Sequence, residues 1–143
     1  MSLKEEDRKV IVTLELERVD KLLSQLDTLQ KAGLWDIVAN RLYYALFHTV
    51  SAMLISDHHE VGTHRGAVSK FSLYYVKQGF FSREEGRLYS RLQSLREDGD
   101  YNCAIDVSES EVEEKLQPTL KLIEKIKGYI EQEHKADTTK QYD

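Results

Sequence analysis

The sequence predicts an all-α fold, an up-and-down bundle of about five helices. Apolar residues recur at spacings of three and four along most of the 143-residue chain, as the buried face of a helix requires. The strict alternation of apolar and polar residues that is typical of strands is missing. One proline and seven glycines leave few of the turns that an all-β fold needs. We expect residues 1–134 to form one helical domain and residues 135–143 to form a flexible polar tail.

The first two helices are expected over about residues 3–32 and 35–56. The first has inward positions at helical spacing, which are Val12, Leu16, Val19, Leu23 and Leu26. Gly33 provides a favourable C-terminal stop. The second helix is the most apolar segment and is apolar on nearly all sides, so we expect it in the middle of the bundle.

Two further helices are expected over about residues 63–78 and from residue 83 onward. Thr63 can cap the third helix, and Gly79 can end it. Ser82 and Glu85 match the capping-box pattern and therefore predict the start of the fourth helix.

The fifth helix is expected to begin after Ser108, which forms a second capping-box pattern with Glu111. Its apolar periodicity continues across Pro118, which predicts one kinked helix rather than two. We expect this helix to end near Glu133.

Charge and composition limit the classes of function. Lys and Arg total 20 against 25 Asp and Glu, giving a net charge of -5, so a broad nucleic-acid-binding surface is not expected. Any RNA contact would be local, made by a few arginines in a cleft. The single cysteine, Cys103, cannot pair within the chain, which suits a reducing cytosol. Without a signal-peptide pattern or a membrane-length apolar run, the sequence predicts a cytoplasmic protein with no membrane association.

The second predicted helix carries two unexpected side chains, Arg41 and His48, on one stripe with Tyr44 and Ala45. One interpretation is a buried ion pair or hydrogen bond to a carboxylate of a neighbouring helix. The other is a phosphate-binding arginine beside a histidine that can transfer protons at neutral pH.

A second constellation lies near the end of the fourth predicted helix. Arg96 and Asp100 are four residues apart and can touch across one helical turn, and Tyr101 adds a hydroxyl beside them. They form either a solvated charge pair or a site in which Asp100 orients Arg96.

Metal and cofactor motifs are not recognisable. The spacing of His58, His59 and His64 with Cys103 matches no standard zinc site. The single Glu-x-x-His pattern that ends at His134 is only one half of a di-iron motif. Since phosphate-binding loops and nucleophile elbows are also missing, we expect no metal and no cofactor.

Three motifs together resemble the small bacterial HEPN proteins. Asn-Arg-Leu-Tyr-Tyr-Ala-Leu-Phe-His at residues 40–48 resembles their second-helix signature. His64, followed by Gly66 and Phe71, resembles the next element, and residues 96–101 resemble an Arg-x-x-x-Asp-Tyr motif. The resemblance covers about residues 10–132.

The resemblance implies a helical bundle that forms a homodimer. Many HEPN proteins pair with a minimal nucleotidyltransferase as toxin and antitoxin, and active members are metal-independent ribonucleases. Their motif is an arginine followed four to six residues later by a histidine, and the two copies face each other across the dimer. Here Tyr101 stands where that histidine is expected, and a tyrosine with a pKa of about 10 is a poor base at neutral pH.

Three functions remain open. The first is a nucleotide- or RNA-phosphate-binding subunit paired with a minimal nucleotidyltransferase in a toxin-antitoxin system, with Arg41, Tyr44 and His64 as binding residues. The second is a metal-independent ribonuclease toxin. Its catalytic candidates are Arg96, Asp100, Tyr101 and His48. The third is a purely structural bundle with a buried polar network. The first two functions require side chains of the second and fourth predicted helices to meet in space.

Overall fold

The computed structural model describes the backbone of residues 3–101 and 107–142 and the side chains of residues 3–100 and 107–133. The elements in chain order are α1 (Glu5–Leu23), α2 (Leu26–Lys31), α3 (Trp35–Ser56), α4 (His64–Phe71), the π-helical turn η1 (Ser72–Val76), α5 (Arg83–Tyr101) and α6 (Glu109–Tyr142). The described residues contain helices and no strand, so the predicted all-α bundle is confirmed.

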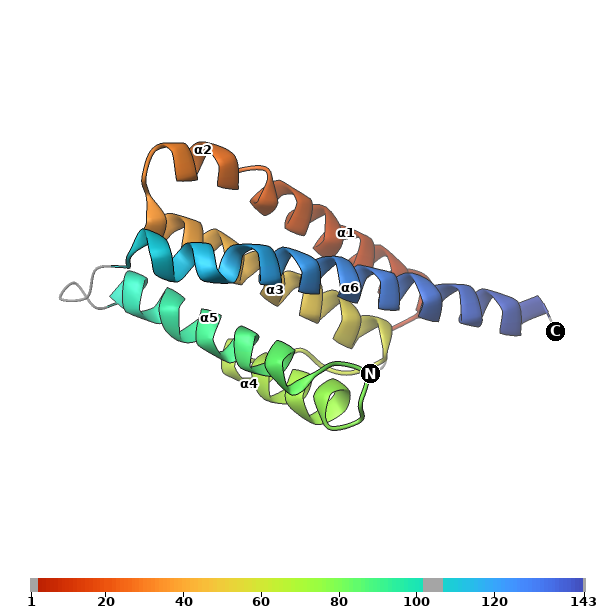
Figure 1. Cartoon of the computed structure of the whole chain (residues 1–143). Coiled ribbons are helices and arrows are strands. Elements are labelled where there is room, and N and C mark those ends of the chain that lie inside the picture. Colours follow the sequence, from red (N-terminus) through yellow and green to blue (C-terminus); the bar gives the residue numbers. More distant parts are fainter. Residues whose placement is uncertain (1–2, 102–106, 143) are drawn as a thin grey trace.

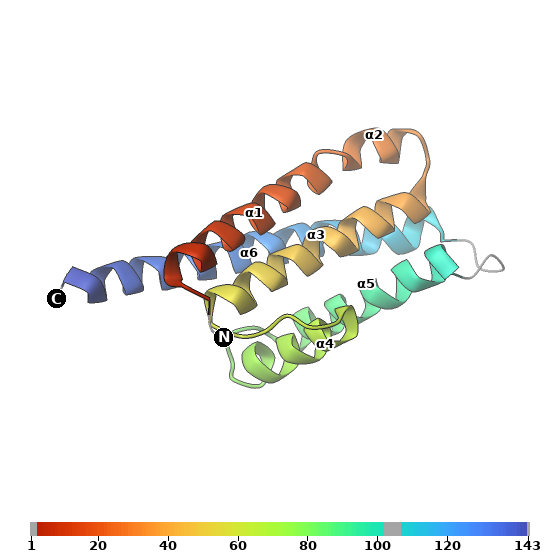
Figure 2. The same ribbon diagram turned by 180° about the vertical axis from the view of Figure 1, so that it is seen from behind.

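Helix α3 is the central element, as its apolar sequence predicts. It packs against α1, α2, α4, α5 and α6, and Figures 1 and 2 show it between α1 on one side and α5 on the other. Side chains such as Leu42, Leu46 and Met53 are completely buried along it. Asn40, Arg41, Tyr44 and His48 form a single half-buried stripe on α3. This stripe is hereafter called the polar stripe.

The prediction of one continuous helix over residues 3–32 is wrong, because the chain turns after Leu23. The Ser24 hydroxyl donates a 2.6 Å hydrogen bond to the carbonyl of Lys21, a local bond that competes with helix continuation. Helix α2 then ends at Gly33, whose φ of 72° is the left-handed conformation expected of a glycine stop. The break places Gln25 between α1 and α2, near the polar stripe.

The third predicted helix is regular only to Phe71. Thr63 caps it as predicted, accepting a 2.9 Å hydrogen bond from the Gly66 amide. Residues 72–76 then widen into η1, in which the Lys77 amide donates to the Ser72 carbonyl at 2.9 Å. The segment ends at Gly79, with φ of 86°.

The capping box before α5 is confirmed in both directions. The Ser82 amide donates to the Glu85 carboxylate at 2.8 Å, and the Glu85 amide donates to the Ser82 hydroxyl at 3.1 Å. Before α6, the Ser108 hydroxyl accepts from the Glu111 amide at 3.3 Å.

Helix α6 continues through Pro118 as one element and reaches Tyr142, so it extends beyond the predicted end near Glu133. Figure 1 shows its C-terminal part projecting past the other helices. The division into a domain and a flexible tail at residue 134 stays a prediction. None of the described helices is both long and apolar enough to cross a membrane.

Candidate functional site

The polar stripe of α3 faces the α1–α2 segment on one side and α4 with α5 on the other. Its members, at positions 40, 41, 44 and 48, share one face because these spacings follow the helical repeat. Most of the other residues of α3 belong to the apolar core. Polar side chains of neighbouring helices therefore meet α3 along this stripe.

Arg96 and Asp100 of α5 lie against the polar stripe. The Asn40 side-chain nitrogen donates to both carboxylate oxygens of Asp100, at 3.1 and 3.4 Å. The Arg96 Nη1 atom lies 3.5 Å from Asp100 Oδ2, so the predicted pairing across one turn is confirmed. Asp100 thus contacts both Asn40 of α3 and Arg96 of α5.

The guanidinium of Arg96 is buried, with 4% of the residue exposed. Its central carbon lies 4.7 Å from the ring centroid of Tyr43 and 5.6 Å from that of Tyr44, which are cation–π distances. Burial raises the pKa of Tyr43 to about 12, so its hydroxyl stays protonated at neutral pH. Arg96 therefore provides a fixed positive charge beside the aromatic part of the polar stripe.

Arg41 is held by amide oxygens instead of the predicted carboxylate. Its Nε atom donates to Gln25 Oε1 and its Nη1 atom donates to Asn40 Oδ1, both at 2.7 Å. Within the described part of the chain it forms no ion pair, so the carboxylate interpretation is wrong for Arg41. Its charge is oriented but not neutralised, and the remaining N–H groups can bind an anion.

His48 does pair with a carboxylate. Its Nδ1 atom lies 2.6 Å from Glu15 Oε2 of α1, and both side chains are largely covered. A carboxylate at Nδ1 fixes the orientation of the ring and leaves Nε2 as the other functional nitrogen.

His64 reaches the same region from the first turn of α4. Its ring centroid lies 4.4 Å from that of Phe47 and 5.5 Å from that of Tyr44. Burial lowers the pKa of His64 below its ordinary value of 6.5, and the nearby charges of Arg96 and His48 lower it further. His64 is thus a neutral imidazole beside a cationic guanidinium.

The structure brings all the described candidate residues into one region. These are Arg41, Tyr44, His48, His64, Arg96 and Asp100. The side chain of Tyr101 and the residue Cys103 lie outside the described part of the chain.

Four contributors were missed as site residues by the sequence reasoning, namely Glu15, Gln25, Asn40 and Phe47. Asn40 could have been found, because it stands next to Arg41 on the polar stripe. Glu15 and Gln25 give no comparable signal, since each is one of many polar residues in the segment from α1 to α2.

The histidines do not gather around one point. His58 lies 3.3 Å from Glu5, and His59 stacks on Tyr74 with centroids 4.0 Å apart, whereas His64 packs against Phe47. Among the side chains that the structure describes, no three His, Cys, Asp or Glu residues are arranged to hold a metal ion.

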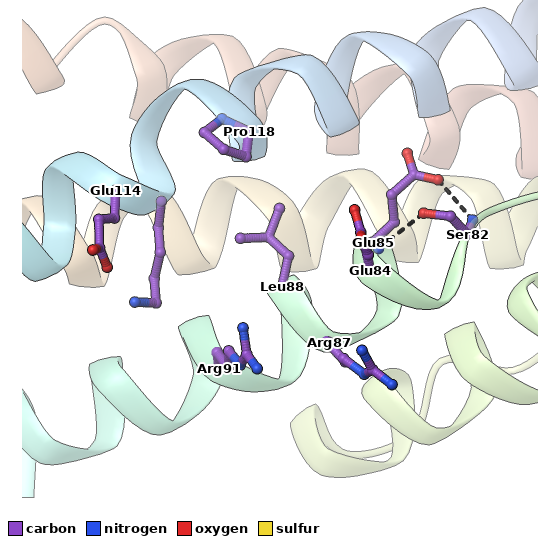
Figure 3. A pocket seen from close by; sticks show the side chains of 9 residues that line it. Ser82, Glu84, Glu85, Arg87, Leu88, Arg91, Glu114 and Pro118 are labelled. Atoms are coloured by element: carbon purple, nitrogen blue, oxygen red, sulfur yellow. Dashed lines mark hydrogen bonds between the residues drawn. The ribbon is translucent and has the colours of Figure 1, made fainter.

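Two hollows lie away from the polar stripe. One, of about 560 Å³, separates α5 from α6 and is shown in Figure 3. Arg87 and Arg91 of α5 and Lys115 of α6 line it, with Leu88 and Pro118 as apolar contacts. The other, of about 480 Å³, lies between α5 and the α4–η1 segment. Neither hollow is lined by a predicted site residue.

The comparison with known families matches the fold and the motifs. The family model described as the HEPN domain matches residues 14–129. The chain therefore belongs to the HEPN domain family.

Similarity to the relatives extends over most of the chain. A protein of Thermotoga maritima named "UPF0332 protein" is 28% identical over 125 residues, which cover 87% of this chain and 95% of that protein. The Methanocaldococcus jannaschii protein named "Putative toxin MJ0605" is 27% identical over 117 residues, covering 82% of this chain and 87% of its own. A second protein of that organism, "Putative toxin MJ0142", is 24% identical over 115 residues, covering 80% and 78%.

Proposed function

We propose that this protein is the nucleotide- or RNA-phosphate-binding HEPN subunit of a toxin-antitoxin system, paired with a minimal nucleotidyltransferase. The observation that carries the proposal is the position of Arg41. This arginine is oriented by two amide oxygens at 2.7 Å, and no described carboxylate neutralises it. The toxin names of two relatives support the proposed system.

Phosphate suits this arrangement of charges. A guanidinium presents several N–H donors in one plane and can bind two phosphate oxygens at once. Arg41 uses two of its donors for Gln25 and Asn40, which hold the plane in place. The half-buried ring of Tyr44 lies beside both Arg96 and His64 and offers a face on which a nucleobase can stack.

A local site also agrees with the charge of the whole protein. With a net charge of -5, long-range attraction does not draw RNA to the surface as a whole. Binding therefore depends on Arg41 and Arg96, and we expect a cytoplasmic homodimer that presents two such sites. The nucleotidyltransferase is expected to co-purify with the protein from its native host.

The binding experiment uses fluorescence anisotropy of a short labelled RNA, repeated at several salt concentrations. Arg41→Ala should weaken binding about tenfold or more and reduce the slope of log affinity against log salt by about one. Arg91→Ala is the matched control, because Arg91 is exposed on α5 and lines the hollow away from the polar stripe. Equal affinity of Arg41→Ala and Arg91→Ala, or no binding by the natural protein, contradicts the proposal.

A metal-independent ribonuclease toxin is the second candidate, favoured by the imidazole of His64 near Arg96 and that of His48 near His64. RNA incubated with the pure protein should be cleaved equally with and without a chelator. Arg96→Ala should abolish cleavage, and Arg96→Lys, which keeps the positive charge, provides a second variant in case the first is poorly folded. Intact RNA after prolonged incubation removes this candidate and leaves the binding function in place.

A further inference from the structure

We propose that His64 and His48 form the acid–base pair of an RNA-cleaving site, with His64 as the base. This inference rests on the second candidate function, the ribonuclease. It gives His64 the task that the family motif assigns to the position occupied here by Tyr101. The imidazole is supplied by α4 rather than by the end of α5.

The imidazoles of His64 and His48 both pack against the rings of Phe47 and Tyr44. Their centroids lie 4.4 Å (His64) and 5.2 Å (His48) from that of Phe47. The corresponding distances to Tyr44 are 5.5 and 6.4 Å. Both histidines are half-buried, so they are held in position but not sealed in the core. An apolar core would not require two imidazoles at this point.

The surroundings of His64 favour the neutral ring that a base must have. Partial burial penalises its charged form, and the positive charge of Arg96 acts in the same direction. The titratable and charged groups that face it are Arg96 from α5 and His48, Tyr43 and Tyr44 from α3. None of these is a carboxylate that would stabilise a protonated His64.

The surroundings of His48 differ from those of His64, because a carboxylate lies beside His48. Glu15 Oε2 lies 2.6 Å from His48 Nδ1, so a carboxylate faces this ring. In the proposed reaction His48 is the acid, and its Nε2 atom gives a proton to the leaving oxygen. Two like groups in unlike environments are the usual basis for dividing acid and base roles.

The reaction balances with these residues alone. His64 removes the proton of an RNA 2′-hydroxyl, whose oxygen forms a bond to the adjacent phosphorus. The bond between phosphorus and O5′ breaks, and the imidazolium of His48 donates its proton to O5′. The products are a 2′,3′-cyclic phosphate and a 5′-hydroxyl, and exchange with water restores both imidazoles. Arg96 and Arg41 stabilise the charge on the phosphoryl oxygens.

The test compares cleavage and binding of one RNA by the full-length protein and two variants. His64→Phe keeps an aromatic ring against Phe47, and His64→Gln keeps a polar side chain. Each should lower the cleavage rate by about a hundredfold or more while changing RNA affinity less than tenfold. His59→Gln is the matched control, because His59 stacks on Tyr74 outside the site and should leave the rate unchanged.

Analysis of the product ends provides an independent readout. A cyclic phosphate and a 5′-hydroxyl are expected, and an RNA with a single 2′-deoxy substitution at the cleaved position should remain intact. Normal cleavage by both His64 variants, or cleavage of the deoxy-substituted RNA, overturns the inference. RNA that is bound but never cleaved also overturns it, while the phosphate-binding function would stand.

Discussion

Asn40 and Asp100 join α3 to α5 through a forked contact between residues 60 positions apart in the sequence. The amide nitrogen of Asn40 reaches both carboxylate oxygens, while its own oxygen accepts from Arg41 at 2.7 Å. Asp100 also contacts Arg96. The small amide of Asn40 therefore couples the two arginines on which the proposed function depends.

A double-mutant cycle measures this coupling. Asn40→Ala and Asp100→Ala should each lower the free energy of unfolding, and the double variant should lose less than the sum. We expect a coupling energy of about 0.5–1.5 kcal/mol, as for a partly exposed hydrogen bond to a charged group. Urea unfolding of the four proteins gives the value. Strict additivity would show that the contact does not join the two helices in solution.

Arg96 should matter for stability as well as for binding. Because its guanidinium is buried against Tyr43, Arg96→Ala removes packing, the cation–π contact and one of the partners of Asp100. The expected loss in the free energy of unfolding is about 2–4 kcal/mol. Arg91→Ala, an exposed change on the same helix, should stay within about 0.5 kcal/mol. Full stability of Arg96→Ala would contradict a role in the buried network.

The lowered pKa of His64 predicts a specific dependence of stability on pH. The unfolded chain binds the proton at its ordinary pKa of 6.5, whereas the folded protein binds it only at lower pH. Stability from this group is therefore complete above pH 6.5 and declines as the pH falls toward the lowered value. Unfolding measured at about pH 7.5 and about pH 5.5 should show a smaller loss in His64→Phe than in the natural protein. Identical losses in the two proteins would show that the His64 pKa is not lowered.

Two glycines should respond in opposite directions to alanine. Gly33 has φ of 72° at the end of α2, and Gly33→Ala should destabilise the protein by about 1 kcal/mol through backbone strain alone, since nothing crowds the site. Gly128 lies within α6 with open space around it, so Gly128→Ala should stabilise by up to about 1 kcal/mol. Thermal unfolding distinguishes the two, and a shift of the same sign in both would contradict this explanation.

Local chemistry explains which parts of the fold could be predicted. Caps depend on neighbouring residues, so Ser82 and Thr63 marked helix starts correctly. The break after Leu23 coincides with a local Ser24 hydrogen bond within an otherwise unbroken apolar pattern, and periodicity does not detect it. The π-helical turn at residues 72–76 contains Tyr75, whose hydroxyl lies 2.8 Å from the carboxylate of Asp57. That contact joins residues 18 positions apart and leaves no local signature.

The candidate site, like the fold, could be predicted from the sequence only in part. Helical spacing correctly placed Arg41 and His48 on one stripe, because both belong to α3. Their partners come from other elements, and the sequence did not show that His48 meets Glu15 while Arg41 meets only amide oxygens. The approach of His64 to Arg96 likewise depends on how α4 and α5 pack together. The resemblance to a family motif selected these residues as candidates but did not predict the contacts between them.

The order of the elements along the chain affects when the site can exist during synthesis. Helices α1 to α3 leave the ribosome first and carry Glu15, Arg41 and His48, whereas Arg96 follows on α5. A nascent chain therefore has no complete site until α5 has emerged and docked. The activity proposed above would thus be withheld from the nascent chain until α5 has joined the bundle.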